Sequence, residues 1–111
     1  MYKTILCAIE ASPEGKKVLT KASQLAELYG SNLMVVSVLP YTLLPNDYQK
    51  KLKDEISPLI DEIIKPFGIP RKNRYVKVGK PYEVICKEAG RRKADLIVLG
   101  THSKKGLHAA I

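Results

Sequence analysis

Four short apolar segments recur along the chain, with turn-forming residues between them. They are KTILCAI (3–9), LMVVSVL (33–39), RYVKV (74–78) and DLIVLG (95–100). Their length and their content of Val, Ile and Leu predict β-strands, and three of them are apolar enough to be buried on both faces of a sheet. The segment 74–78 alternates apolar residues with Arg74 and Lys77, which favours a strand at the edge of the sheet.

The stretches between these strands carry helical patterns. Ser12 stands at a capping position, Pro13 at the first helical position, and apolar residues then recur at helical spacing as far as Gly30, which ends the helix. A third helix begins near Pro81 and ends within GRRKAD (90–95). Between them, a second helix is predicted by a wide apolar stripe formed by Leu52, Ile56, Leu59, Ile60, Ile63 and Ile64.

Pro58 interrupts the second helical pattern. Proline lacks the backbone donor and its ring clashes with the preceding turn. We therefore expect either a kink at this residue or a helix that starts at Ser57, with an irregular segment before it.

The predicted order is β α β α β α β, which favours an α/β fold. Strands that alternate with helices form an open parallel sheet with right-handed crossovers and helices on both faces, in three layers. The 111 residues fit one domain, 1–111. After the strand 95–100 and a polar loop, the last residues predict the start of another helix.

Composition narrows the class of protein. The chain is 45% hydrophobic and 27% charged, and no apolar run approaches the ~20 residues of a membrane span. The N-terminus MYKTILCAIE becomes acidic too early for a secretory signal, so we expect a cytoplasmic protein that does not enter a membrane. Cys7 and Cys86 have no metal-type spacing, and we expect both to be buried free thiols.

Charge is distributed unequally between the two halves of the chain. Residues 1–64 carry seven Lys and Arg against eight Asp and Glu, whereas residues 65–111 carry twelve against three, a net charge of +9. Such asymmetry can mark a surface for nucleic acid or another anion. The basic residues are not interleaved with aromatic ones apart from Tyr75 and Tyr82, so we favour a solvated face and do not expect nucleic acid as the partner.

Two strand ends carry the candidate chemistry, because ligands of open parallel sheets bind beyond the carboxyl ends of the strands. Glu10 follows the first strand and could accept hydrogen bonds from a ribose hydroxyl or an adenine amino group. Alternatively it neutralises the N-terminus of the next helix. The loop GTHSKKG (100–106) follows the fourth strand and could surround a phosphate with backbone N–H groups, or it is an ordinary loop before a helix.

Catalytic constellations lack support in the sequence. His102 and His108 have no Cys or acidic partner at metal spacing, and Ser12 and Ser103 have no evident base beside them. We therefore expect no catalytic or metal-ligating residue.

Two blocks of sequence resemble the universal stress protein family. They are residues 2–40 and 78–107, and the second is the more specific: V-G-x-P at a helix start, A-D-L-I-V-x-G in a strand and G-[ST]-H in a loop. The resemblance implies a parallel sheet of strand order 3-2-1-4-5, usually in a homodimer, and in one branch of the family a site for ATP or AMP. It also implies a last helix and a fifth strand, which we expect this chain to lack.

The pattern for nucleotide binding in that branch is G-x2-G-x9-G-[ST], with an Asp at the end of the first strand. Gly100 matches the first glycine, Ser103 replaces the second, and the final pair would fall just after Ile111. Glu10 replaces the Asp and keeps the carboxylate. A Cβ at position 103 would obstruct a close approach of the backbone to a phosphate.

The leading hypothesis is an adenine-nucleotide site between the first and fourth strands, for ATP or AMP, with Mg²⁺ accompanying ATP. We expect a binding module rather than an enzyme, with weak ATP hydrolysis at most. Residues 8–12 and Val38 would line the nucleoside, and residues 99–103 the phosphates. The expected site consists of Ala8, Ile9, Glu10, Ala11, Ser12, Val38, Leu99, Gly100, Thr101, His102 and Ser103. The rival, favoured by Ser103, is a dimerising interaction module of the family's branch that does not bind nucleotides.

Overall fold

The computed structural model describes residues 2–40 and 43–100 and the backbone of 107–110. Its five-stranded sheet has the order β3-β2-β1-β4-β5, and the first four strands are parallel. The strands are β1 (Thr4–Ala8), β2 (Asn32–Leu39), β3 (Arg74–Val78), β4 (Leu96–Gly100) and β5 (Leu107–Ala110). The α/β class, the strand order 3-2-1-4 and the edge position of β3 are therefore confirmed.

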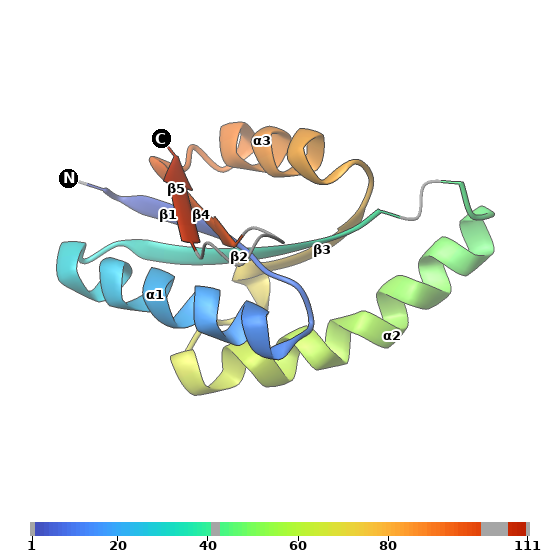
Figure 1. Ribbon diagram of the computed structural model, residues 1–111, viewed down its shortest axis with the longest axis horizontal. Helices are drawn as coiled ribbons and strands as arrows, with labels where there is room; N and C mark the ends of the chain where they lie inside the picture. The colour runs from blue at the N-terminus through green and yellow to red at the C-terminus, as the bar shows by residue number, and fades with distance from the viewer. Residues whose placement is uncertain (1, 41–42, 101–106, 111) are drawn as a thin grey trace.

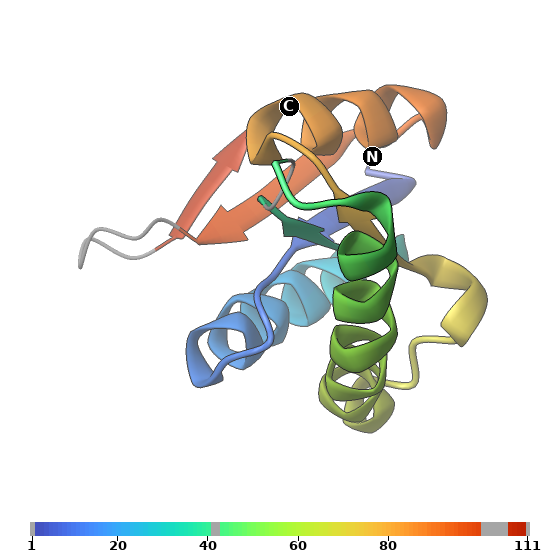
Figure 2. The ribbon, with the colours of Figure 1, turned by 90° about the vertical axis from the view of Figure 1, so that its right-hand side faces the viewer.

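Three α-helices cover the two faces of the sheet (Figures 1 and 2). The helices α1 (Pro13–Tyr29) and α2 (Asn46–Ile64) lie on one face, and α3 (Pro81–Arg91) lies on the other. The larger core lies under α1 and α2 and includes Ile5, Leu19, Val35 and Ile60, all inaccessible to solvent. The smaller core lies under α3 around Leu6, Val36, Ile85 and Ala89.

The helix α1 begins and ends as its sequence predicts. The Gly15 backbone N–H donates to Ser12 Oγ at 3.2 Å, and Pro13 occupies the first helical position, where its missing N–H costs no hydrogen bond. Gly30 ends the helix in the left-handed conformation at φ 64°, which a residue with a Cβ adopts only with strain.

One of the two expectations for α2, a helix that starts at Ser57, is wrong. The chain is helical from Asn46, so the segment before Ser57 is not irregular, and Pro58 lies inside the helix. Ser57 Oγ donates to the carbonyl oxygen of Lys53 at 2.7 Å, in the turn before the proline. The N-terminal part of α2 extends beyond the sheet (Figure 1). Two short 3₁₀ turns, Lys65–Phe67 and Arg71–Asn73, then lead into β3.

Two further expectations are corrected. Residues 107–110, for which we expected the start of a helix and no fifth strand, form β5 antiparallel to β4, with Val98 opposite Ala109. This pairing satisfies backbone groups along an edge of β4 that would otherwise have no strand beside it. Cys7 is buried as expected, but Cys86 lies on the exposed side of α3.

Candidate functional site

The carboxyl ends of β1 and β4 lie side by side. The register of this parallel pair places Ala8 opposite Leu99. Glu10 comes two residues after Ala8, and Gly100 comes directly after Leu99. The two strand ends that the sequence singled out are therefore brought to the same edge of the sheet.

Asp95 sets this register from the other end of the same two strands. Its Oδ2 accepts the backbone N–H groups of Lys3 at 2.9 Å and Thr4 at 3.0 Å, and its own N–H donates to the Thr4 carbonyl at 2.8 Å. Asp95 belongs to the A-D-L-I-V motif, but it lies at the amino edge, away from the candidate site. Asp95 therefore has a structural role in this motif, because its carboxylate fixes where β4 begins against β1.

Val38 lies at the same edge of the sheet, on the neighbouring strand β2. Ala8 is paired with Val36, and the Ile9 N–H continues the ladder by donating to the Val36 carbonyl at 3.0 Å. Val38 then lies two residues beyond Val36, at the carboxyl end of β2. Ala8 and Val38 are both partly buried against the smaller core under α3, so they share one face of the sheet.

Two other expected site residues face the opposite side. Ile9 is 5% exposed and belongs to the larger core, and Ala11 packs against that core. The side chain of Ile9 therefore stabilises the fold, and only its backbone lies at the edge.

The turn between β1 and α1 is tightly constrained. The Ser12 N–H donates to the Glu10 carbonyl at 2.9 Å, and Ser12 Oγ is engaged as the helix cap. A Cβ at Gly15 would lie 2.0 Å from the Glu10 carbonyl oxygen, so only glycine allows the first turn of α1 to approach this backbone. The turn holds the Glu10 backbone in place while its side chain remains exposed.

Gly100 has a packing role that the sequence did not indicate. A Cβ at this position would lie 2.7 Å from Val18 Cγ2, and valine is a stiff β-branched side chain that cannot easily turn away. Its φ is not positive, unlike the φ of Gly30 and Gly68. Glycine is therefore required here by the close approach of β4 to α1, whether or not a ligand binds. Thr101, His102 and Ser103 lie outside the described residues.

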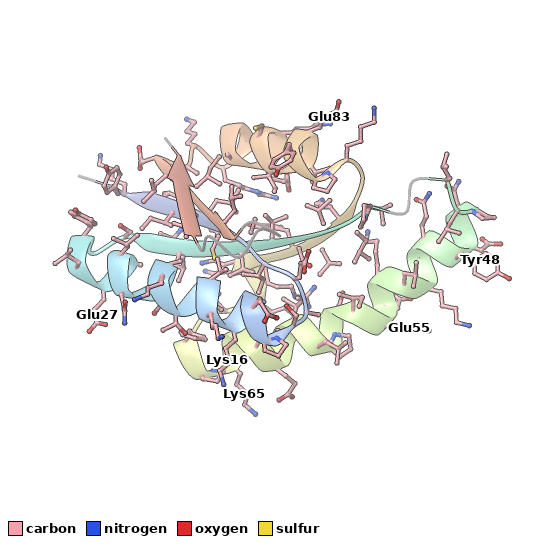
Figure 3. The ribbon with its side chains drawn as sticks, viewed as in Figure 1. Lys16, Glu27, Tyr48, Glu55, Lys65 and Glu83 are labelled. Atoms are coloured by element: carbon pink, nitrogen blue, oxygen red, sulfur yellow. The ribbon has the colours of Figure 1, made fainter. Side chains whose placement is uncertain are left out.

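A hollow of about 280 Å³ adjoins the β1–α1 turn and touches two of the expected site residues. Its walls are mainly apolar and come from the turn, the first turn of α1 and the C-terminal part of α2: Ala11, Ser12, Pro13, Lys16, Leu59 and Ile63. Lys16, labelled in Figure 3, is its one charged side chain. Lys16 was not among the expected site residues, although its place in the first turn of the helix after the first strand was a usable signal.

A larger hollow, of about 380 Å³, lies at the opposite edge of the sheet. It is lined by the C-terminal part of α1, the start of β2 and the segment before β3, including Glu27, Asn32, Phe67 and Asn73. Asn73 Nδ2 donates to Asn32 Oδ1 at 3.1 Å and to the Leu33 carbonyl at 3.3 Å, which ties the β3 side of this hollow to β2. This hollow is at the amino edge of the sheet, so it is not part of the candidate site.

The chemistry of the described residues is that of binding groups. Burial raises the pKa of the Cys7 thiol, which keeps it protonated and unreactive at neutral pH. Within residues 2–40 and 43–100, no group of three or more His, Cys, Asp and Glu side chains is placed to hold a metal ion. No helix in this part of the chain is both long and apolar enough to cross a membrane.

Comparisons with known proteins point to one family. The family model described as "Universal stress protein family" matches residues 1–111. The chain is 33% identical over 107 residues to the "Universal stress protein in QAH/OAS sulfhydrylase 3'region" of Thermus aquaticus, covering 91% of this chain and 78% of that protein.

Solved structures show the same fold. Universal stress protein UspA from Lactobacillus plantarum superposes with a TM-score of 0.73 at 20% identity, covering 94% of this chain and 82% of that chain. A universal stress protein in complex with cAMP superposes with a TM-score of 0.58 at 19% identity, covering 86% of this chain and 70% of that chain.

Proposed function

Because the chain belongs to the universal stress protein family, we propose that it is a cytoplasmic stress-response module that binds an adenine nucleotide, ATP or AMP, between the carboxyl ends of β1 and β4. The observation that carries the proposal is the register of these strands, which places the Glu10 and Gly100 segments side by side. The structural neighbour in complex with cAMP, itself an adenine nucleotide, is consistent with this ligand class.

Each part of the edge has a role in this proposal. Ala8 and Val38 form an apolar wall for the adenine ring, and the exposed Glu10 carboxylate accepts hydrogen bonds from the ribose hydroxyls. Gly100 and the loop after it meet the phosphates, with Mg²⁺ accompanying ATP. The proposal assigns no general base, so the module binds its ligand and signals by being occupied.

Equilibrium binding tests the proposal directly. Isothermal titration of the chain with ATP and with AMP is expected to give saturable binding, and Glu10→Ala is expected to weaken it roughly tenfold, since a hydrogen bond to a charged group is lost. Glu14→Ala is the matched control, because Glu14 is an exposed carboxylate in the first turn of α1. Equal affinities of the two variants, or no saturable binding at millimolar nucleotide, would contradict the proposal.

The second candidate is a module that forms homodimers and does not bind nucleotides. The packing of Gly100 against Val18 favours it, because this glycine needs no ligand to explain it. Under this candidate, Ser103→Gly creates or sharpens ATP binding, whereas under the first candidate it changes the affinity little. Sedimentation equilibrium with and without ATP then shows whether a dimer forms without nucleotide.

A further inference from the structure

A buried carboxylate with three cations around it lies outside the proposed nucleotide site. Glu88 of α3 is 97% buried, since 3% of its side chain is exposed. Its Oε1 lies 3.9 Å from Lys77 Nζ of β3 and 3.7 Å from an Arg92 terminal nitrogen, and its Oε2 lies 3.6 Å from an Arg91 terminal nitrogen. We call Lys77, Arg91 and Arg92 the basic triad.

All three ion-pair distances exceed a normal hydrogen-bond length. Glu88 Oε1 and Arg92 Nε are buried and have no hydrogen-bond partner among the described residues. Burying a carboxylate without hydrogen bonds is costly, so this arrangement is not explained by stability alone. One carboxylate faces three cations, which leaves the cluster with two uncompensated positive charges.

A contact with an aromatic ring holds Arg92 of the basic triad in place, while part of each triad side chain stays exposed to solvent. The Arg92 guanidinium lies 4.1 Å from the centroid of the Tyr75 ring, a cation–π contact that fixes its plane. The exposed fractions of the side chains are 40% for Lys77, 52% for Arg91 and 30% for Arg92. Their N–H donors are therefore close together, positioned and within reach of a ligand.

Two simpler explanations account for part of the cluster. Arg91 and Arg92 lie at the C-terminus of α3, where cations interact favourably with the helix dipole. Lys77 lies on the edge strand β3, where charged side chains oppose unwanted strand pairing. Neither explanation accounts for a buried Glu88 that draws the three side chains together. The other acidic residue of α3, Glu83, lies in its first turn, at the opposite end from Arg91 (Figure 3).

We propose that the basic triad is a binding site for a phosphate-type oxyanion, either free phosphate or the phosphate of a monoester. Lys77, Arg91 and Arg92 bind its oxygens through charge-assisted hydrogen bonds, which arginine forms well with planar pairs of oxygens. Glu88 and Tyr75 position the triad from behind. Lys77 is the register partner of Val38, and β2 separates the triad's strand from β1 and β4. The triad is therefore separate from the Glu10 and Gly100 segments, and the proposal does not rest on the nucleotide site.

Phosphate titrations followed by amide NMR on the whole chain test the site. Inorganic phosphate and O-phosphoserine are added at constant ionic strength, and saturable shifts are expected at the amides of Lys77, Arg91 and Arg92. Tighter binding of O-phosphoserine identifies the monoester as the ligand class, and equal binding identifies the free ion. Arg92→Gln is expected to weaken binding roughly tenfold.

Lys51→Gln is the matched control, because Lys51 is an exposed cation on α2, on the other face of the sheet. Equal weakening by Arg92→Gln and Lys51→Gln would show that net charge alone attracts the anion, which overturns the proposal. Shifts that never saturate at millimolar phosphate, or that fall on lysines throughout the chain, overturn it as well.

The phosphate affinities of Tyr75 and Glu88 variants test whether these two residues position the triad. Tyr75→Phe keeps the aromatic ring under Arg92 and is expected to leave phosphate affinity unchanged, whereas Tyr75→Leu removes the ring and is expected to weaken binding severalfold. Glu88→Gln raises the local charge by one unit but removes the carboxylate that gathers the triad. If Glu88→Gln tightens binding, or if Tyr75→Phe and Tyr75→Leu behave alike, the assigned positioning roles are wrong.

Discussion

At the scale of single residues, Asp95 contributes more to the candidate site than its distance suggests. Its carboxylate binds two backbone N–H groups at the start of β1, and its own N–H binds the Thr4 carbonyl. These contacts fix the first residue of β4 against β1. Because strand register is carried residue by residue to the other end, they also fix which residues meet at the carboxyl edge.

Removal of the Asp95 carboxylate tests this role. Asp95→Ala leaves the Lys3 and Thr4 N–H groups without their acceptor and is expected to lower the free energy of unfolding by about 1 to 2 kcal/mol. This value is in the lower part of the range for hydrogen bonds to charged groups, because the site is partly exposed. Asp95→Asn keeps an acceptor oxygen and is expected to lose about half as much. Urea denaturation measures both values, and an Asp95→Ala protein as stable as the parent would contradict the role.

At the scale of secondary-structure elements, α2 shows how tertiary contacts override a local signal. Pro58 favours an interrupted helix, yet α2 is helical from Asn46 to Ile64. Ile60 is fully buried and Ile64 is 3% exposed. Asp61 also accepts two hydrogen bonds from Arg74 of β3, at 2.8 and 3.1 Å. The contacts after the proline hold the helix against the sheet.

Replacement of Pro58 should therefore stabilise the protein. Pro58→Ala restores a backbone N–H inside α2, and it is expected to raise the free energy of unfolding by about 2 kcal/mol, since a helix-interior proline costs about 3 and the gain in unfolded-state entropy offsets up to about 1. Pro13→Ala is the control, because proline at the first helical position costs no hydrogen bond and its replacement should change stability little. A destabilised Pro58→Ala protein would show that the helix needs the proline ring for packing.

The elements that could be predicted from the sequence are those whose signals are local. The apolar runs predicted β1 to β4 to within one residue at each end, and the cap at Ser12 and the stop at Gly30 placed α1. What could not be predicted depends on distant neighbours. Residues 107–110 become a strand because β4 lies beside them, and Gly100 is needed because Val18 of α1 approaches it. The basic triad likewise requires β3 and α3 to be adjacent.

The candidate site was predictable in its position but not in its composition. The alternation of strands and helices placed Glu10 and Gly100 on one edge, as the register has them. It could not show that Ile9 turns into the larger core, or that Lys16 lines the hollow beside the β1–α1 turn, since both depend on how α1 and α2 pack. The roles of Thr101, His102 and Ser103 stay predictions.

At the scale of the whole molecule, the basic triad and the Glu10 and Gly100 segments belong to different strands of the sheet. The basic triad lies on the β3 side of the sheet, with β2 between β3 and β1, and the Glu10 and Gly100 segments follow β1 and β4. The two proposals therefore give a phosphate-bearing ligand two candidate sites, and nucleotide is a candidate ligand for both. Measurements of affinity alone would not distinguish the two.

Thermal stability in the presence of ligand separates the two sites. A ligand that binds only the folded chain stabilises it by about 2.7 kcal/mol at one hundred times its Kd, which for a domain of this size raises the Tm by roughly 10 °C. We expect ATP to produce this shift in the parent and in Arg92→Gln, and about half of it in Glu10→Ala at the same ATP concentration, because a tenfold weaker Kd leaves about 1.4 kcal/mol. If the shift is instead unchanged in Glu10→Ala and about halved in Arg92→Gln, nucleotide acts through the basic triad and the proposed site between β1 and β4 is wrong. A shift by inorganic phosphate that is halved in Arg92→Gln but unchanged in Glu10→Ala would support the triad independently, because phosphate alone carries no ribose for Glu10 to bind.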